Sequence, residues 1–168
     1  LEHFLLPSVL DLAGLAIENK RSDERIRYLA HHDDLTGLPN RMRFLQELSL
    51  ALARAARSGQ QVGLLFLALA RFTEINDTLG HHAGDAALRE GASRLRANVR
   101  EVDMVARLGG DEFVVMTEDF TDSTILAGIA RKLIEQIALP ITYHDQTCRL
   151  TASIGISTYP DDGDDIHA

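Results

Sequence analysis

The stretch Arg107-Leu108-Gly109-Gly110-Asp111-Glu112-Phe113 decides how this sequence folds. Short apolar segments, 104–108 and 112–117, flank the two glycines, and this pattern predicts a β-hairpin because its turn needs positive φ angles that glycine adopts without steric cost. The missing Cβ atoms also let a ligand approach the backbone closely. Asp111 and Glu112 offer hard carboxylate oxygens of the kind magnesium prefers. Taken alone, the stretch fits either a ligand-binding hairpin or a plain surface turn with solvated acids.

Hydrophobic periodicity predicts the elements around this hairpin. Helical spacing of apolar residues predicts helices over 8–32, 41–57, 73–79, 88–99 and 122–138. The unbroken apolar run 62–70 predicts a central strand covered on both faces. Alternation over 150–156 predicts a half-buried strand, which we expect to pair with 141–143. This order of elements predicts an α/β (α+β) sandwich, with a mixed central β-sheet flanked by helices.

The composition fits one domain with a helical extension. The 168 residues are 45% hydrophobic and 25% charged, as in ordinary globular proteins. A net charge of −8 argues against nucleic-acid binding, which needs a basic surface. The single cysteine, Cys148, fits a cytoplasmic location; no apolar run is long enough for a membrane span, and we expect no secretory signal. We interpret 1–32 as a signalling or linker helix and 33–168 as the domain, together a fragment of a longer protein.

Four segments, in this order, resemble the GGDEF family of diguanylate cyclases. They are 33–41 (DDLTGLPNR), 75–81 with Gly84-Asp85, the hairpin 107–113, and 152–157. The resemblance extends from Asp33 to the end and implies a nucleotide-cyclase-like fold, without the family's C-terminal helix. It further implies an enzyme in which two domains, each holding one GTP, meet as a homodimer and join the nucleotides into cyclic di-GMP.

The resemblance also implies roles for individual residues. Residues of the hairpin would carry catalysis, and its two acids would bind magnesium: Gly109, Gly110, Asp111 and Glu112. Asn76 and Asp85 would bind guanine, since an amide and a carboxylate suit its acceptors and donors. The structural alternatives are a helix or turn cap for Asn76 and a helix N-cap for Asp85.

A second candidate ligand site precedes the hairpin. Five residues separate Arg100-Glu101-Val102-Asp103 from Gly109, and the segment matches the family's inhibitory RxxD site in residue type and spacing. At that site the product cyclic di-GMP binds and stops the enzyme. Arginine can pair with phosphate or guanine, and aspartate can accept from guanine N–H groups. A solvated helix end that happens to carry Arg100 and Asp103 is the alternative.

The sequence departs from the family at the metal site. The family pattern Asp-x-Asp-x-Phe-Lys-x-x-Asn-Asp reads here Ala68-Leu69-Ala70-Arg71-Phe72-Thr73-Glu74-Ile75-Asn76-Asp77. Ala68 therefore stands where the family's essential carboxylate would be, and a methyl group cannot coordinate magnesium. Glu74 and Asp77 are the nearby acids that offer a replacement. The sequence predicts weak or absent magnesium binding and impaired cyclase chemistry.

Three functions remain open at this point. The leading interpretation is a regulatory GGDEF domain that binds guanine nucleotide, GTP and/or cyclic di-GMP. An active diguanylate cyclase, with another oxygen in place of the missing carboxylate, is the first alternative. A structural or dimerising module that binds no nucleotide is the second. Segment 10–19 also resembles the closing helix of a GAF sensory domain, so we expect a linked sensory domain upstream and an EAL phosphodiesterase domain downstream.

Overall fold

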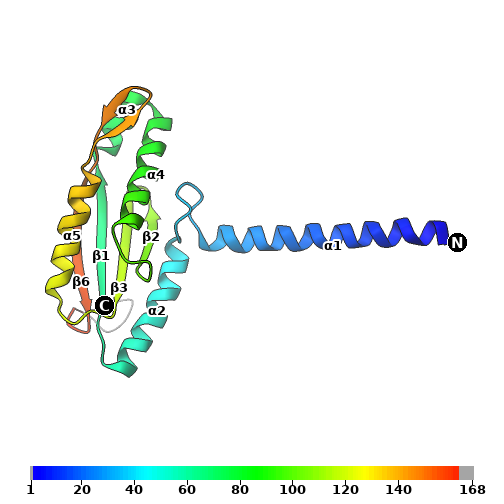
Figure 1. The fold of residues 1–168 in the computed structure, drawn as a ribbon, viewed down its shortest axis with the longest axis horizontal. Coiled ribbons are helices and arrows are strands. Elements are labelled where there is room, and N and C mark those ends of the chain that lie inside the picture. The colour runs from blue at the N-terminus through cyan, green and yellow to red at the C-terminus, as the bar shows by residue number, and fades with distance from the viewer. Residues whose placement is uncertain (1, 163–168) are drawn as a thin grey trace.

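The computed structural model describes residues 2–162, with side chains described from Ile17 onward (Figure 1). The elements are α1 (Glu2–His31), α2 (Arg41–Ser58), β1 (Val62–Ala70), α3 (Phe72–Leu79), α4 (His81–Ala97), β2 (Met104–Gly109), β3 (Glu112–Glu118), α5 (Thr124–Ile137), β4 (Ile141–Tyr143), β5 (Gln146–Cys148) and β6 (Thr151–Tyr159). The predicted helices and the predicted hairpin are confirmed, and the strand predicted over 62–70 has the same bounds in the structure.

The central sheet has four strands in the order β2-β3-β1-β6. Every pair in it is antiparallel, so the expected α/β sandwich is confirmed but the expected mixture of parallel and antiparallel pairs is not found. The reason is topological. The helical connection through α3 and α4 returns β2 in the direction of β1, but β3 of the hairpin lies between them and opposes both.

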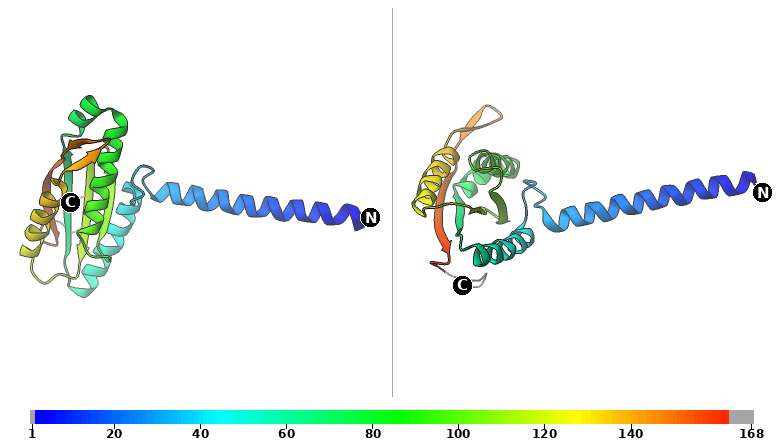
Figure 2. Two further views of the ribbon diagram at one scale, coloured as in Figure 1. Left: turned by 45° about the horizontal axis from the view of Figure 1, so that its top comes forward. Right: turned by 60° about the horizontal axis from the view of Figure 1, so that its bottom comes forward.

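Helices cover the two faces of the sheet unequally, as the end-on view in Figure 2 shows. Leu65, Leu67 and Leu69 of β1 point to one face, where α4 and α5 bury them. On the other face α2 covers the beginning of β1 with Phe44 and Leu48. Beyond α2 this second face is open, because the side chains of Phe66, Ala68 and Ala70 are exposed. The expectation of a strand covered on both faces therefore holds only for the first half of β1.

The pairing expected between 141–143 and the last strand is wrong. β4 pairs instead with β5, Ile141 opposite Cys148, and β6 pairs with β1 along its whole length. The turn between β4 and β5 consists of His144 and Asp145, with φ of 45° and 65°. A two-residue hairpin turn needs positive φ at both positions, and His and Asp tolerate it better than most residues. No glycine marks this turn in the sequence.

Helix α1 projects away from the rest of the chain, and only its last turn lies near the domain (Figures 1 and 2). Ile26 and Leu29 remain 64% and 44% exposed. The apolar residues predicted nearer the start of this helix, Leu12 to Ala16, lie outside the described side chains. Among the residues from 2 to 162, no helix combines the length and apolar character needed to cross a membrane.

Candidate functional site

Ala68, the position to which the resemblance assigns a metal-binding carboxylate, lies on the open face of the sheet. Ala68 sits directly opposite Glu112 of β3 on one side and Ser153 of β6 on the other. Directly opposite residues of an antiparallel pair share one face, with Cβ atoms roughly 5 Å apart. A cavity of 430 Å³ lies beside these three residues; its other lining residues are Phe66, Leu67, Leu108, Phe113, Ile154 and Gly155. Glu112 therefore lies opposite a methyl group at the position where the resemblance implies an acid.

The residues at this position do not fit magnesium. Ala68 and Ala70 contribute no oxygen, and among residues 17–162 no three histidine, cysteine or acidic side chains gather closely enough to hold a metal ion. Of the acids that could replace the missing one, Glu74 turns to Arg71 instead, with its Oε2 3.6 Å from the arginine Nε. Asp77 is exposed on α3. Magnesium needs several oxygen ligands in near-octahedral geometry, which Glu112 and Asp111 alone do not provide.

The glycine turn of the hairpin is held by two contacts to its backbone. Gly109 and Gly110 have φ of 148° and 51°, as the sequence predicts for this turn. The amide of Leu69 in β1 donates to the carbonyl of Asp111 at 2.9 Å. Arg107 donates through Nε and Nη2 to the carbonyl of Gly110 at 3.0 and 2.8 Å. The turn is thus a fixed structure and not a loose surface loop.

Arg107 also joins the hairpin to the segment after α1. Its Nη1 donates to both oxygens of Asp33, at 2.9 and 3.1 Å. Asp33 in turn accepts from the amide and the hydroxyl of Thr36, at 2.8 and 2.7 Å. We call these three residues, with the Gly110 carbonyl, the hairpin clasp. The clasp ties the segment that follows α1 to the turn beside the candidate site.

The clasp changes the acidity of Asp33. Partial burial acts to raise the pKa of this carboxyl, but the hydrogen bonds from Thr36 and the guanidinium of Arg107 together outweigh it. The pKa of Asp33 therefore lies below its ordinary value of 3.8. The charged form is the stable one in the folded domain, as an ion pair with Arg107 requires.

Asn76 lies where α3 packs on α4, against Gly84, the residue that precedes Asp85. Asn76 lies inside α3, and its Oδ1 is buried without a hydrogen-bond partner, so the side chain is not a cap. Helix α4 begins at His81 after Gly80, which places Asp85 in its second turn. The alternative reading of Asp85 as a helix N-cap is therefore wrong. Both side chains are partly buried, and among the described side chains, 17–162, neither has a hydrogen-bond partner.

The RxxD residues lie at the opposite end of the hairpin from the glycine turn, since Met104 begins β2 directly after Asp103. Asp103 is buried, with only 2% of its side chain exposed, and pairs with Arg100 at 2.9 Å. Its oxygens also accept from the Arg100 amide and the Thr117 hydroxyl, at 2.9 and 2.8 Å. Arg100 further donates to the Glu118 carbonyl at 2.6 Å. A ligand that uses Arg100 must compete with these internal contacts.

Two further hollows adjoin these positions. A cavity of 510 Å³ lies beside the RxxD turn, with Arg100, Asp103 and Lys132 in its wall.

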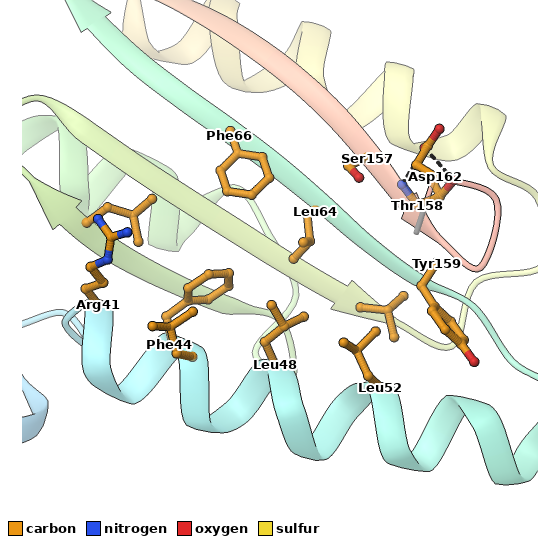
Figure 3. A pocket seen from close by; sticks show the side chains of 13 residues that line it. Arg41, Phe44, Leu48, Leu52, Leu64, Phe66, Ser157, Thr158, Tyr159 and Asp162 are labelled. Carbon is orange, nitrogen blue, oxygen red and sulfur yellow. Dashed lines mark hydrogen bonds between the residues drawn. The ribbon is translucent and has the colours of Figure 1, made fainter. Parts of the chain in front are cut away.

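The second cavity, of 240 Å³, runs between α2 and strands β1 and β6 (Figure 3). Phe44, Leu48 and Leu52 of α2 face Leu64 and Phe66 of β1 across it, with Arg41 at one end and Tyr159 near the other. It shares Phe66 and Leu108 with the cavity beside Ala68. Together they form an open and largely apolar furrow on this face of the sheet.

Sequence reasoning missed the contacts of Arg107 and Thr117. Arg107 was visible as a cation two residues before the glycine pair, and Asp33-x-x-Thr36 is a typical side-chain turn. Nothing in the sequence indicates that these two meet, because 74 positions separate them. Thr117 reaches Asp103 only through the register of the hairpin.

Comparison with known proteins identifies the family. The model of the family "Diguanylate cyclase, GGDEF domain" matches residues 30–168. The bifunctional diguanylate cyclase/cyclic di-GMP phosphodiesterase MucR of Pseudomonas aeruginosa is 42% identical, over 97% of this chain and 24% of its own length. The diguanylate cyclase TpbB of the same species is 44% identical, over 83% of this chain and 32% of its own. The chain thus spans a third or less of these relatives.

Solved structures agree with this assignment. A sensory box/GGDEF family protein from Caulobacter crescentus has a TM-score of 0.77 at 41% identity, covering 80% of this chain and 87% of that one. The coiled coil and GGDEF domain of DgcB from the same organism, in complex with c-di-GMP, has a TM-score of 0.79 at 26% identity, covering 95% and 86%. The match of the family model, the sequence identity and the shared fold lead to one conclusion: this chain belongs to the GGDEF family of diguanylate cyclases.

Proposed function

We propose that this chain is a regulatory GGDEF domain that binds guanine nucleotide, GTP and/or cyclic di-GMP, and has impaired cyclase chemistry. The observation that carries the proposal is the pairing of Ala68 with Glu112 and Ser153. This pairing puts a methyl group at the position where the family holds metal. The loss is local, because the hairpin turn, Asn76 and Asp85 are all retained around it.

Retention of the nucleotide-facing residues supports binding over a purely structural role. Asn76 keeps a buried carbonyl oxygen with no partner, which destabilises the unliganded domain. An apolar residue would serve a purely structural helix contact better, so a polar amide at this position supports a role in binding. GTP would present its base to Asn76 and Asp85, and its ribose and phosphates to the hairpin glycines, where no Cβ obstructs approach.

Cyclic di-GMP is the second proposed ligand, at Arg100 and Asp103. The cavity of 510 Å³ beside this turn offers space for it. Because Asp103 is saturated by internal hydrogen bonds, binding would require Arg100 to exchange its contacts with Asp103 and Glu118 for contacts with the ligand. We therefore expect weaker binding here than at a turn whose arginine is free.

An active diguanylate cyclase is the alternative function. The retained hairpin Gly109-Gly110-Asp111-Glu112 favours it, and TpbB, which is 44% identical, is a diguanylate cyclase. In the longer protein, we propose, residues 1–32 form the helix that links a sensory domain to the GGDEF domain of 33–168. An EAL domain downstream, a cytoplasmic location and a homodimer belong to the same proposal.

Calorimetric titration with GTP, with and without magnesium, tests the proposed function. Wild type should bind GTP with little dependence on magnesium, and Ala68→Asp should gain at least about tenfold in affinity when magnesium is added, since a carboxylate completes the ligand set. Ala68→Asn is the matched control, because it has the same shape without the charge, and it should gain nothing.

Two results would overturn the proposal. Tight, magnesium-dependent GTP binding by wild type, together with formation of cyclic di-GMP, would favour the active cyclase. No binding of GTP or cyclic di-GMP by wild type or by Ala68→Asp would favour the purely structural module.

A further inference from the structure

The contact between α3 and α4 leaves no room for a side chain at Gly84. A Cβ added there would lie 1.7 Å from Oδ1 and 2.6 Å from Cγ of Asn76, and 2.8 Å from Cε2 of Phe72. Gly84 is buried in the first part of α4, in a helical conformation that any residue adopts. The glycine is therefore required for space and not for backbone freedom. The space that it leaves is filled by the Asn76 amide.

This contact fixes where the Asn76 amide lies. Its Oδ1 is buried against α4 and has no hydrogen-bond partner. Nδ2 is then the polar atom of the amide that remains free to meet a ligand, and it can only donate. Asp85, the residue after Gly84, carries a carboxylate that can only accept when ionised. The two residues together offer a ligand one donor and one acceptor.

We propose that Gly84 is a positioning residue, which seats the Asn76 amide so that its Nδ2 faces the nucleobase and thereby favours guanine over adenine. The proposal rests on the guanine-nucleotide binding proposed above. Guanine offers the O6 acceptor beside N–H donors, which complements one donor and one acceptor. Adenine offers an amino donor where guanine has O6. An amide that turned Oδ1 toward the base in place of Nδ2 would no longer favour guanine over adenine.

Substitution of Gly84 by alanine should displace the amide. The new methyl group would occupy the place of Oδ1, so Asn76 must change rotamer or α3 must move away from α4. Gly91, two turns later in α4, provides a matched control. It is also buried, but its nearest neighbour to an added Cβ is Cδ1 of Leu69 at 3.3 Å, the end of a flexible side chain that can yield.

The first test measures base selectivity. GTP and ATP are titrated against wild type, Gly84→Ala and Gly91→Ala. We expect Gly84→Ala to lose about tenfold in GTP affinity with ATP affinity unchanged, which reduces the GTP-to-ATP ratio; one lost hydrogen bond has about this effect. Gly91→Ala should keep the wild-type ratio. A general loss of folded protein would lower both affinities together and leave the ratio unchanged.

The second test uses stability and needs no nucleotide. Gly84→Ala should lower the melting temperature by several degrees, and Asn76→Ala should restore part of that loss in the double variant, because the two shortest contacts are then gone and only that with Phe72 remains. Additive effects of the two substitutions would show that Gly84 and Asn76 do not depend on one another, and would overturn the proposed positioning role.

The two tests separate this proposal from the proposed function. If wild type binds nucleotide and Gly84→Ala retains the GTP-to-ATP ratio, the positioning role is wrong while the proposed function stands. If wild type binds no nucleotide, the proposed function fails, and the melting temperatures alone then test the Gly84–Asn76 contact.

Discussion

Asp33 shows how one residue can connect two parts of this chain that are distant in sequence. Its carboxylate accepts from Thr36 on its own turn and from Arg107 at the start of the glycine hairpin. Only 18% of its side chain and 14% of that of Arg107 are exposed, so water screens the pair less than it would a surface ion pair. The same guanidinium holds the carbonyl of Gly110. The position of the helix end and the shape of the hairpin turn therefore depend on one another.

The pH dependence of stability follows from the pKa of Asp33. Because this pKa is lowered in the folded state, the clasp stabilises the domain above the ordinary value of 3.8, and the contribution is lost as pH falls through the lowered pKa. Asp33→Asn should reduce the free energy of unfolding by about 1–2 kcal/mol at pH 7. Urea denaturation should show this difference shrinking below about pH 4.

The exposed neighbour Asp34 provides the control for this experiment. Asp34→Asn should change the stability at pH 7 by less than about 0.5 kcal/mol. A difference between wild type and Asp33→Asn that stays constant down to pH 3 would show that the charge of Asp33 has no part in the clasp.

At the scale of elements, the β2–β3 hairpin carries a different kind of constraint at each end. Its glycine end depends on backbone conformation, since an added Cβ at Gly109 or Gly110 would meet no atom within 4 Å. Its other end depends on buried polar contacts among Arg100, Asp103 and Thr117. The strands between them are buried and shield the RxxD turn from the candidate site.

The two glycines of the turn should differ in their tolerance of substitution. Gly110 has φ of 51°, in the left-handed region that other residues adopt at a cost of about 1–2 kcal/mol. Gly109 has φ of 148°, a region that is nearly restricted to glycine. Gly109→Ala should therefore lower the free energy of unfolding more than Gly110→Ala, and Gly110→Asn should be tolerated best. Equal losses for the two alanine variants in urea denaturation would contradict this account.

At the scale of the whole molecule, the domain and its projecting helix differ in what stabilises them. The domain buries apolar residues on both faces of its sheet, whereas α1 keeps even Ile26 and Leu29 exposed. Helix stability in proteins comes mostly from tertiary packing. In a single copy of this chain, α1 therefore contributes little to the free energy of unfolding of the domain.

Removal of residues 1–29 tests this separation. The shortened chain keeps the clasp and should change its melting temperature by no more than about 3 °C, because the free energy of the domain lies elsewhere. Limited proteolysis of the full chain should cut within α1 before it cuts the domain. A large drop in melting temperature would show that α1 packs on the domain or on another copy in solution.

Local signals in the sequence were sufficient for the elements but not for their partners. The glycine pair predicted the hairpin turn, and the apolar run predicted β1, because both depend on near neighbours. The pairing of β4 with β5 could not be predicted, since its turn at His144-Asp145 lacks glycine. The Asn76–Gly84 contact depends on how α3 crosses α4, and the Arg107–Asp33 pair on how the whole sheet is assembled. Ala68 was identified as the departure from the family, but its position opposite Glu112 came only from the strand register.

The open surroundings of Ala68 affect which mutations this position can accept in evolution. The side chain is exposed beside a cavity of 430 Å³, and no neighbouring side chain fills the place of the absent carboxylate. An alanine codon that ends in a pyrimidine becomes an aspartate codon through one base change. Such a mutation would meet no steric penalty and would need no compensating change in the core. Where the codon of Ala68 ends in a pyrimidine, one base change is therefore enough to place an acid at this position.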